Sequence, residues 1–351
     1  MDVRAAFLEG VKDLRVEDVA LPALAPDMVR LRVLSCGICG TNINMWRYSG
    51  PPAGAPREPG AYGHEVAGEV VEVGARVTTV RPGDRVAVEL FENRACTRCR
   101  YCHQGLFWHC QEQRPVRGAG FIDEMLLYDR GLYPLPPGVS AAEGSLVEPF
   151  ACSLHALRLA GLAGGESICV LGAGVLGLFA VAGAKQLGAG RVICTAKYPT
   201  QAALARRFGA DVVLDSMDPE VNQHIRDAAG TPGPDVVVET VGGKTDTLQQ
   251  GCTVVRPAGK VMVLGLFEEP VPVDTVQAVY KELSIIFPAT YSVINRRHEY
   301  ELALEFMASG KVPGKDLITH RFGLGDIQHA FEVAADKTRG SVRVNIEPPR
   351  G

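Results

Sequence analysis

The chain has 351 residues, of which 46% are apolar, and a formal net charge of −4 at pH 7. This length favours two domains, because a single hydrophobic core stops growing at roughly 250–300 residues. The charge argues against a nucleic-acid or anionic-membrane partner, and no apolar run reaches the roughly 18 residues of a membrane span. The N-terminus lacks the apolar segment of a signal peptide, so we expect a cytoplasmic protein.

Residues 1–35 predict short β-strands, because apolar and polar side chains alternate over residues 3–7 and 29–35. A proline-containing loop is expected between them, at residues 21–27. The motif Cys36-Gly37-Ile38-Cys39 follows. Its CxxC spacing could mark a redox pair, but no thioredoxin-like βαβ pattern surrounds it.

Three side chains that suit a catalytic zinc come next: Cys39, His64 and Glu65. Catalytic zinc sites keep three protein ligands and leave one position for water or substrate. His64 and Glu65 could instead be an ordinary polar pair at a strand start. The longer pattern, GHEVAGEVVEVGARV over residues 63–77, favours the site, because its glycines punctuate an apolar strand where the backbone bends or passes close to another group.

This pattern resembles the signature of the zinc-dependent medium-chain alcohol dehydrogenases, GHE-x2-G-x5-G-x2-V, at every fixed position. The resemblance implies that Cys39, His64 and Glu65 bind the catalytic zinc. It implies further that Cys36 is a packing residue and that the Thr41 hydroxyl accepts the alcohol proton and passes it on.

Two residues depart from the pattern of that family. Asn42 replaces an acid, and Asn44 replaces a histidine that often ends the proton relay. An amide cannot titrate near neutral pH, so it cannot serve as a general base. The proton then leaves through water, or another group takes the place of the histidine.

Residues 45–62 are rich in glycine, proline and aromatic residues and therefore predict a loop. Within it, Trp46 and Tyr48 either line a substrate pocket or pack beneath the loop.

Four cysteines in a short segment predict a second zinc site, of the structural type. Four thiolates at this spacing can close around one tetrahedral ion, and four unrelated buried thiols would not cluster so densely. The spacing also resembles the structural zinc lobe of the same family, and we expect this zinc to staple a loop that has little core of its own. The four residues are Cys96, Cys99, Cys102 and Cys110.

Residues 116–150 predict further strands and a Pro-Pro-Gly turn, after which Glu148 begins a helix. The resemblance places a glutamate here near the catalytic metal, above all in the polyol and sugar dehydrogenase branch, where it would exchange with water as a ligand. The alternative is a carboxylate that favours a helix N-terminus.

From about residue 156 the pattern changes to strand, turn and helix. A continuous apolar strand at 167–171 runs into the GxGxxG motif, and a helix is expected over 178–187. In this context the motif predicts a dinucleotide site, because the glycines allow a tight turn and the helix N-terminus binds the pyrophosphate. The residues expected to bind the cofactor here are Gly172, Gly174, Val175, Leu176 and Gly177.

The next strand, residues 191–195, ends where NAD-binding chains carry an acid for the adenosine ribose, but here the residues are Ala196 and Lys197. A 2′-phosphate would gain a cationic partner, which favours NADP(H) over NAD(H). If Lys197 is only a solvated surface lysine, either cofactor could bind.

Alternating helices and strands continue to about residue 265 and predict a parallel, doubly wound sheet. Its strand ends should border the cofactor, at Thr240, Gly242, Leu264 and Gly265. The tail departs from this rhythm, with helices expected at 299–309 and 326–335 and strands at 317–322 and 341–346.

The expected fold class is therefore α/β. A Rossmann doubly wound parallel sheet takes residues 156–285, and a mostly β, GroES-like catalytic domain with a four-cysteine zinc lobe takes residues 1–155, rejoined by 286–351. The resemblance implies a dehydrogenase with two zinc ions per chain that interconverts a secondary alcohol (polyol, sugar or cyclitol-like) and its carbonyl with NADP(H) or NAD(H). It also implies a small-molecule substrate and a homodimer or homotetramer.

Two other functions fit parts of the chain. The first is a zinc-free quinone or enoyl reductase on the same scaffold, which would need neither set of zinc ligands. The second is a non-catalytic NADPH-binding protein, to which Asn44 gives slight support. A zinc-bearing nucleic-acid module is disfavoured by the cysteine spacing and the negative charge.

Overall fold

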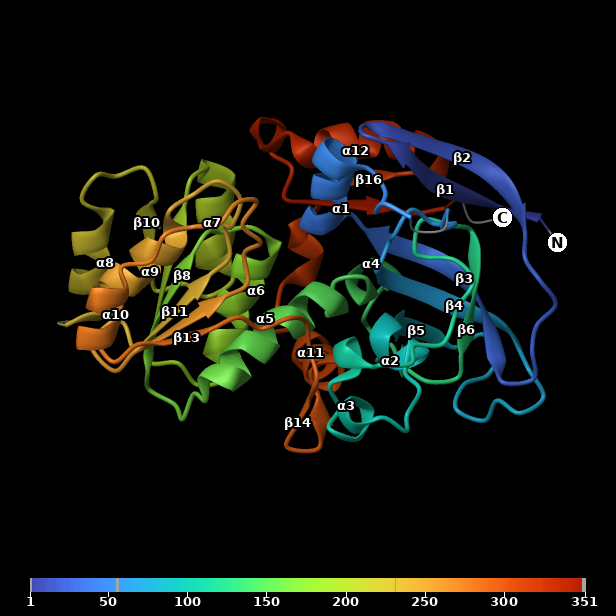
Figure 1. Cartoon of the computed structure of the whole chain (residues 1–351), viewed down its shortest axis with the longest axis horizontal. Helices are drawn as coiled ribbons and strands as arrows, with labels where there is room; N and C mark the ends of the chain where they lie inside the picture. The colour runs from blue at the N-terminus through green and yellow to red at the C-terminus, as the bar shows by residue number, and fades with distance from the viewer. Residues whose placement is uncertain (1, 55–56, 231, 349–351) are drawn as a thin grey trace. The chain divides into compact units, whose positions relative to one another are not determined.

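The computed structural model describes residues 2–54, 57–230 and 232–348 (Figure 1). The chain divides into two compact units, one of residues 1–148 with 314–351 and the other of residues 149–313. The sequence placed these boundaries at residues 155 and 285 instead.

The first unit is built on a largely antiparallel sheet with strand order β16-β17-β3-β4-β5-β7, and β6 also pairs with β3. A separate hairpin of β1 (Asp2–Gly10) and β2 (Asp13–Ala20) accompanies it. The alternating segments predicted at 3–7 and 29–35 are strands, and their apolar side chains belong to the core of this unit. The sheet strands are β3 (Met28–Gly37), β4 (Glu65–Val73), β5 (Arg85–Val88), β6 (Glu124–Tyr128), β7 (Leu132–Pro134), β16 (Ile318–Phe322) and β17 (Arg343–Ile346).

The pairing of β3 with β4 positions the candidate metal ligands. In this antiparallel register Gly37 lies opposite Glu65. Cys39, just beyond the end of β3, is thereby brought beside His64, just before the start of β4. The final strand β17 pairs with the other edge of β3, with Asn345 opposite Gly37. The C-terminal segment therefore returns to the same place.

Short helices complete the first unit. The segment Met45–Ser49, predicted as loop, is a π-helical turn, η1, that continues α1 (Gly40–Asn44). It is helical because Trp46 is buried and packs on Phe331, with ring centroids 6.0 Å apart. The other helices are α2 (Leu90–Arg94), α3 (Arg100–His103), η2 (Phe107–His109), α4 (Ala141–Gly144), η3 (Gly314–Leu317), η4 (Leu324–Asp326), α12 (Ile327–Ala335) and η5 (Lys337–Arg339).

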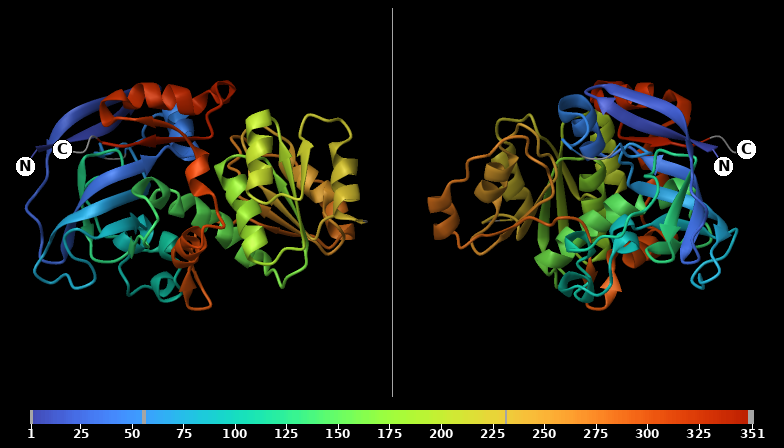
Figure 2. Two further views of the ribbon diagram at one scale, coloured as in Figure 1. Left: turned by 180° about the vertical axis from the view of Figure 1, so that it is seen from behind. Right: turned by 45° about the vertical axis from the view of Figure 1, so that its right-hand side comes forward.

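The second unit is a six-stranded sheet of order β10-β9-β8-β11-β12-β13, and all its neighbouring strands are parallel. Helices cover both faces of the sheet (Figures 1 and 2). This is the doubly wound topology, in which the strand order reverses between β8 and β11. Its strands are β8 (Ser167–Leu171), β9 (Arg191–Ala196), β10 (Val212–Asp215), β11 (Val236–Glu239), β12 (Lys260–Val263) and β13 (Ser284–Ile286), and its connecting helices are α6 (Val175–Gln186), α7 (Pro199–Arg207), α8 (Val221–Ala229), α9 (Thr247–Val254) and α10 (Thr275–Tyr280).

Helix α5 (Val147–Ala160) explains why the units divide where they do. It crosses the predicted boundary at residue 155 without interruption, and Phe150 stacks on Phe179 of α6 at a centroid distance of 4.7 Å. Helix α11 (Glu299–Ala308) belongs to the same unit, because Arg158 donates a 2.8 Å hydrogen bond to Glu299. A short hairpin that the sequence did not predict precedes α11, formed by β14 (Val293–Ile294) and β15 (Arg297–His298).

Candidate active site

The first unit brings the three predicted ligands of the catalytic zinc together. One ligand atom each from Cys39, His64 and Glu65 lies within 4.8 Å of the others. Thiolate sulfur, imidazole nitrogen and carboxylate oxygen form a donor set that suits a catalytic zinc ion. The residues present therefore fit the predicted metal.

A backbone carbonyl orients the imidazole of His64. Its Nδ1 lies 3.0 Å from the carbonyl oxygen of Tyr62. A carbonyl can only accept, so Nδ1 carries the proton in this hydrogen bond, and Nε2 keeps its lone pair for a metal.

Glu65 has a buried counter-ion that the sequence analysis missed. Arg343, on the C-terminal strand β17, forms an ion pair with the Glu65 carboxylate, and both side chains are only 2% exposed. Arg343 also donates to Asn345 at 3.0 Å. Gly37 leaves space for the guanidinium, because a Cβ on residue 37 would lie 1.4 Å from Arg343 Nη2. In the sequence, the residues around Arg343 show the polar-apolar alternation of a strand, but this pattern does not indicate which strand they pair with.

Glu148 is buried close to this group, in the first turn of α5. Burial raises the pKa of Glu148 to about 8; the charges of Glu65 and Cys39 add to the rise, and His64 opposes it.

Glu89, the N-cap of α2, is a second buried carboxylate in this region that the sequence analysis missed. Its pKa is held well above the ordinary value by burial and by repulsion from Glu92 and Glu148.

The Thr41 hydroxyl, the predicted proton acceptor, lies next to the Cys39 thiol. Thr41 Oγ1 lies 3.7 Å from Cys39 Sγ, and the Thr41 side chain is exposed. Burial, together with the Glu65 carboxylate, raises the pKa of Cys39 to about 12 in the metal-free protein. A metal must therefore displace a proton from this thiol when it binds. Cys36 is fully buried in the core and does not belong to the ligand group.

The four-cysteine lobe also converges. Cys99 Sγ lies 3.5 Å from Cys102 Sγ, which lies 3.9 Å from Cys96 Sγ. Cys110 Sγ accepts a 3.3 Å hydrogen bond from the Cys96 amide. All four thiols are free, and their sulfur atoms lie within 4.8 Å of one another, as a single tetrahedral ion requires.

The predicted dinucleotide turn has the expected backbone in the second unit. Gly172 has φ +96°, and a Cβ on Gly177 would lie 2.0 Å from the Gly172 carbonyl, so glycine is required at both positions. Gly174 faces open space, and α6 begins at Val175 with no side-chain cap. The free amides of Val175 and Leu176 therefore suit a pyrophosphate.

The neighbouring strand ends are held by Glu239, which the sequence analysis missed. Its Oε1 accepts hydrogen bonds from the amides of Val241 and Gly242 at 2.7 and 2.9 Å. Thr240 Oγ1 donates to the Leu171 carbonyl at 2.8 Å, which joins this turn to the strand before the glycine motif. Leu264 and Gly265 follow β12 and donate their amides to the Glu239 carbonyl.

The end of β9 carries the predicted specificity residues. Ala196 is buried, whereas Lys197 is exposed and lies 5.8 Å from the ring centroid of Tyr198. Neither Ala196 nor Lys197, the two described residues at this strand end, carries a carboxylate.

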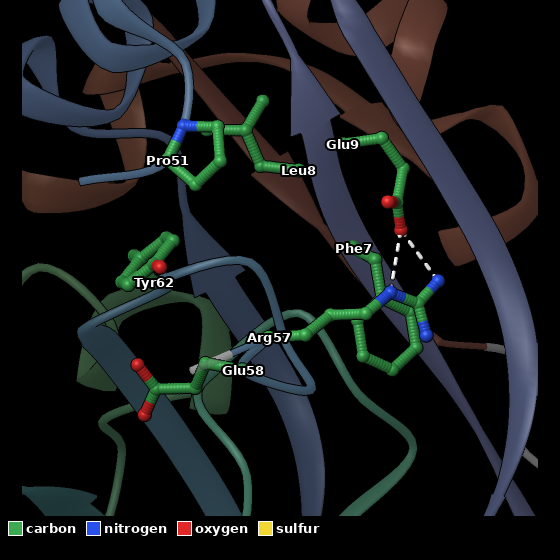
Figure 3. Close-up of a pocket in the computed structure, with 7 residues that line it drawn as sticks. All are labelled: Phe7, Leu8, Glu9, Pro51, Arg57, Glu58 and Tyr62. Carbon is green, nitrogen blue, oxygen red and sulfur yellow. Dashed lines mark hydrogen bonds and ion pairs between the residues drawn. The ribbon is translucent and has the colours of Figure 1, made fainter. Parts of the chain in front are cut away.

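A pocket of the first unit adjoins the segment before His64 (Figure 3). Its wall includes Glu58 and the ring of Tyr62, and Arg57 lies over the Phe7 ring at 3.6 Å while pairing with Glu9. Trp46 and Tyr48 do not line this pocket: Trp46 is a core residue and Tyr48 is 57% exposed.

Comparisons with known proteins bear on both units. An alcohol dehydrogenase GroES-like domain matches residues 25–137, and a zinc-binding dehydrogenase family matches residues 175–309. Sorbitol dehydrogenase of Bacillus subtilis (strain 168) is 30% identical over 99% of this chain and 98% of its own. The chain belongs to the zinc-dependent medium-chain alcohol and polyol dehydrogenase family.

Solved structures support the same family and fold for the dehydrogenase. An Escherichia coli oxidoreductase/dehydrogenase of unknown specificity matches with a TM-score of 0.90 and 30% identity, over 100% of both chains. A Sinorhizobium meliloti 1021 protein, assigned as a zinc-binding dehydrogenase and solved with NADP, matches with a TM-score of 0.85 and 28% identity, over 99% of this chain and 100% of that one. These comparisons confirm the predicted fold class and the prediction of an alcohol or polyol dehydrogenase that uses zinc and a nicotinamide cofactor. Among the described residues, no helix is both long and apolar enough to cross a membrane.

Proposed function

We propose that the dehydrogenase oxidises a secondary alcohol of the polyol, sugar or cyclitol type, or reduces the matching carbonyl. Cys39, His64 and Glu65 would hold the catalytic zinc, and Glu148 would act as an exchangeable further ligand. The convergence of those first three side chains within 4.8 Å carries the proposal. A zinc-free quinone or enoyl reductase would not need this donor set.

The proposed reaction moves one hydride and one proton. When bound, zinc would act as a Lewis acid toward the substrate oxygen. When bound, the nicotinamide cofactor would supply the acceptor for the hydride from the alcohol carbon. The Thr41 hydroxyl would take the O–H proton and pass it to solvent. Asn44 cannot take that proton, so water at the exposed Thr41 side chain is the simplest route.

The proposed cofactor is NADP(H) in preference to NAD(H). Lys197 is exposed at the end of β9, and no acid accompanies it there. A 2′-phosphate would gain a charge-assisted contact with Lys197. The S. meliloti relative was solved with NADP, which agrees with this preference.

A second zinc ion is proposed for the four-cysteine lobe. The elements around it, α3 and η2, are very short, so the lobe has little hydrophobic core of its own. A closed tetrahedral site would hold these segments together and leave no position for substrate.

The proposed assembly is a homodimer or homotetramer. Strand β13 ends the second sheet, and apolar side chains near it are exposed, including Val279 at 74%, Tyr280 at 85% and Phe287 at 64%. A strand at the edge of a sheet, beside exposed apolar residues, suits pairing with a second copy of the chain.

A substrate panel tests the proposed function. The purified protein, with its zinc content measured, would be incubated with polyols, sugars, cyclitols and simple secondary alcohols. NADP⁺ and NAD⁺ would be supplied in parallel, and the appearance of reduced nicotinamide followed. We expect turnover that is stronger with NADP⁺ and is lost on chelation. Tight cofactor binding without turnover in either direction would favour a non-catalytic NADPH-binding protein instead.

A further inference from the structure

One backbone carbonyl joins two of the proposed zinc ligands. The Tyr62 oxygen accepts hydrogen bonds from His64 Nδ1 and from Asn42 Nδ2, both at 3.0 Å. Asn42 uses its other amide atom as well, because its Oδ1 accepts a 3.2 Å hydrogen bond from the Cys39 amide. A continuous chain of hydrogen bonds thus runs from Cys39 through Asn42 and Tyr62 to His64. Asn42 is only 3% exposed, so water competes little with these bonds.

The turn that presents this carbonyl is strained and tightly held. Ala61 and Tyr62 have φ values of +43° and +61°, which side chains other than glycine rarely adopt. Gly60 and Gly63 on either side lie against residues 119–121: a Cβ on Gly60 would lie 2.1 Å from the Ala119 carbonyl, and one on Gly63 would lie 2.8 Å from the Phe121 amide. Strain of this kind persists only where surrounding contacts fix it, and it gathers at functional sites.

We propose that Asn42 is a positioning residue that fixes the separation of Cys39 and His64 through the Tyr62 carbonyl, so that the ligand pair is arranged before zinc binds. The inference rests on the proposed function, because it assumes that these two residues hold the metal. It goes further by assigning a role to a residue that carries no ligand atom.

The role requires an amide. Asn42 must accept from the Cys39 amide and donate to the Tyr62 carbonyl at the same time, and a primary amide can do both. An ionised carboxylate can only accept, so Asn42→Asp would keep the bond to Cys39 but set a charged oxygen against the Tyr62 carbonyl. Asn42→Ala would remove both bonds. The two variants therefore distinguish two roles of Asn42. Both variants break the hydrogen-bonded bridge between the zinc ligands, but Asn42→Asp keeps the bond to the Cys39 amide that caps α1.

The experiment measures zinc release from the whole, zinc-loaded protein to a chromophoric chelator. Release should occur in two phases, and the Cys39→Ser variant identifies the phase that belongs to the catalytic site. We expect Asn42→Ala and Asn42→Asp both to weaken zinc binding and speed that phase by about 10–100-fold, the usual effect of losing a partner behind a metal ligand. The phase from the four cysteines should not change and serves as an internal standard.

Asn44→Ala is the matched control, because it removes the same type of side chain two residues further along α1. Among the described residues, the Asn44 side chain forms no hydrogen bond. This variant should leave both phases at the wild-type rate. The unfolding temperature of the zinc-free variants shows whether Asn42 acts only on overall folding. Asn42→Asp is nearly isosteric, so it keeps the test decisive if Asn42→Ala does not fold.

Two results would overturn the inference. Release from Asn42→Asp at the wild-type rate would show that the bond to Tyr62 does not matter. A lower unfolding temperature with unchanged release would show a purely structural role. In both cases the Cys39-dependent phase remains, and the proposed function stands. Loss of that phase from the wild-type protein itself would overturn the proposed function and this inference together.

Discussion

The guanidinium of Arg343 lies against the carboxylate of Glu65, and both groups are almost completely buried. The last strand of the chain therefore supplies the counter-ion for a proposed zinc ligand. Removing one partner of such a pair leaves an uncompensated charge in a low-dielectric site, which costs about 3–5 kcal/mol.

We therefore expect Arg343→Met to lower the free energy of unfolding of the zinc-free protein by about 3 kcal/mol or more. Urea denaturation, followed for the transition of the first unit, measures this change. The double variant Arg343→Met/Glu65→Gln should recover much of the loss, because no charge is then left unpaired. If the double variant is as unstable as the single one, the loss comes from packing and not from the ion pair.

Glu148 should make the stability of the metal-free protein depend on pH. Its folded-state pKa is about 8, against an ordinary value of 4.5. Between these values the folded state holds a proton that the unfolded state has lost, so stability falls as pH rises through this window. Glu148→Gln stays neutral and should lose less stability between about pH 5 and pH 8. Unfolding free energies at both pH values check this. Glu268→Gln removes an exposed carboxylate and serves as the control, which should lose as much stability between these pH values as the wild type. If Glu148→Gln also loses as much stability as the wild type, the raised pKa of Glu148 is contradicted.

Local patterns were enough to predict most of the fold. The apolar runs and glycine turns of the second unit predict its strands because each buried parallel strand is continuous and apolar. The trio Cys39, His64 and Glu65 could be predicted because its spacing matches a known signature. The four-cysteine cluster could be predicted because thiols this close together along a chain are rarely placed there by core packing alone.

Long-range pairing could not be predicted in the same way. Arg343 meets Glu65 only because β17 lies beside β3, and no local pattern in residues 341–346 specifies that neighbour. Helix α5 crosses the expected domain boundary because Phe150 packs on Phe179, a contact between separate segments of the chain. The role of Asn42 depends on the backbone conformation of Tyr62, and a positive φ at a tyrosine has no signature in the sequence.

The cysteines of the zinc lobe should differ in reactivity once zinc is removed. Hydrogen bonds from the backbone amides of Gln111 and Cys102 lower the pKa of Cys99 to about 6, whereas burial raises that of Cys102 to about 12. At neutral pH Cys99 is then mostly thiolate and Cys102 is a thiol. We expect iodoacetamide to label Cys99 more than about 10-fold faster than Cys102, with labelling that slows as pH falls through 6. Peptide mass spectrometry gives both rates. Added zinc should protect all four thiols, and equal rates would contradict the difference in pKa.

Lys197 should set the choice of cofactor. A charge-assisted contact with the 2′-phosphate is worth about 1.5–3 kcal/mol, which corresponds to roughly tenfold or more in affinity. We expect Lys197→Asp to raise the KM for NADP⁺ at least about tenfold and to leave the KM for NAD⁺ within about twofold. Lys311→Asp makes the same charge change at another exposed lysine of the second unit and serves as the control. A parallel rise in both KM values would show that Lys197 affects folding or general binding and does not discriminate between the cofactors.

Asn44 tests the route of the proton. It is the last residue of α1, three residues beyond Thr41, and it is partly buried. A histidine there would add a group that titrates near pH 6.5, whereas asparagine adds none. If the proton passes this position, Asn44→His should introduce an inflection near about pH 6.5 in the pH profile of kcat/KM for alcohol oxidation. Asn44→Gln changes the size of the side chain without adding a titrating group, and its profile should match that of the wild type. Identical profiles for the His and Gln variants would place residue 44 off the proton path and leave the exposed Thr41 hydroxyl in direct exchange with water.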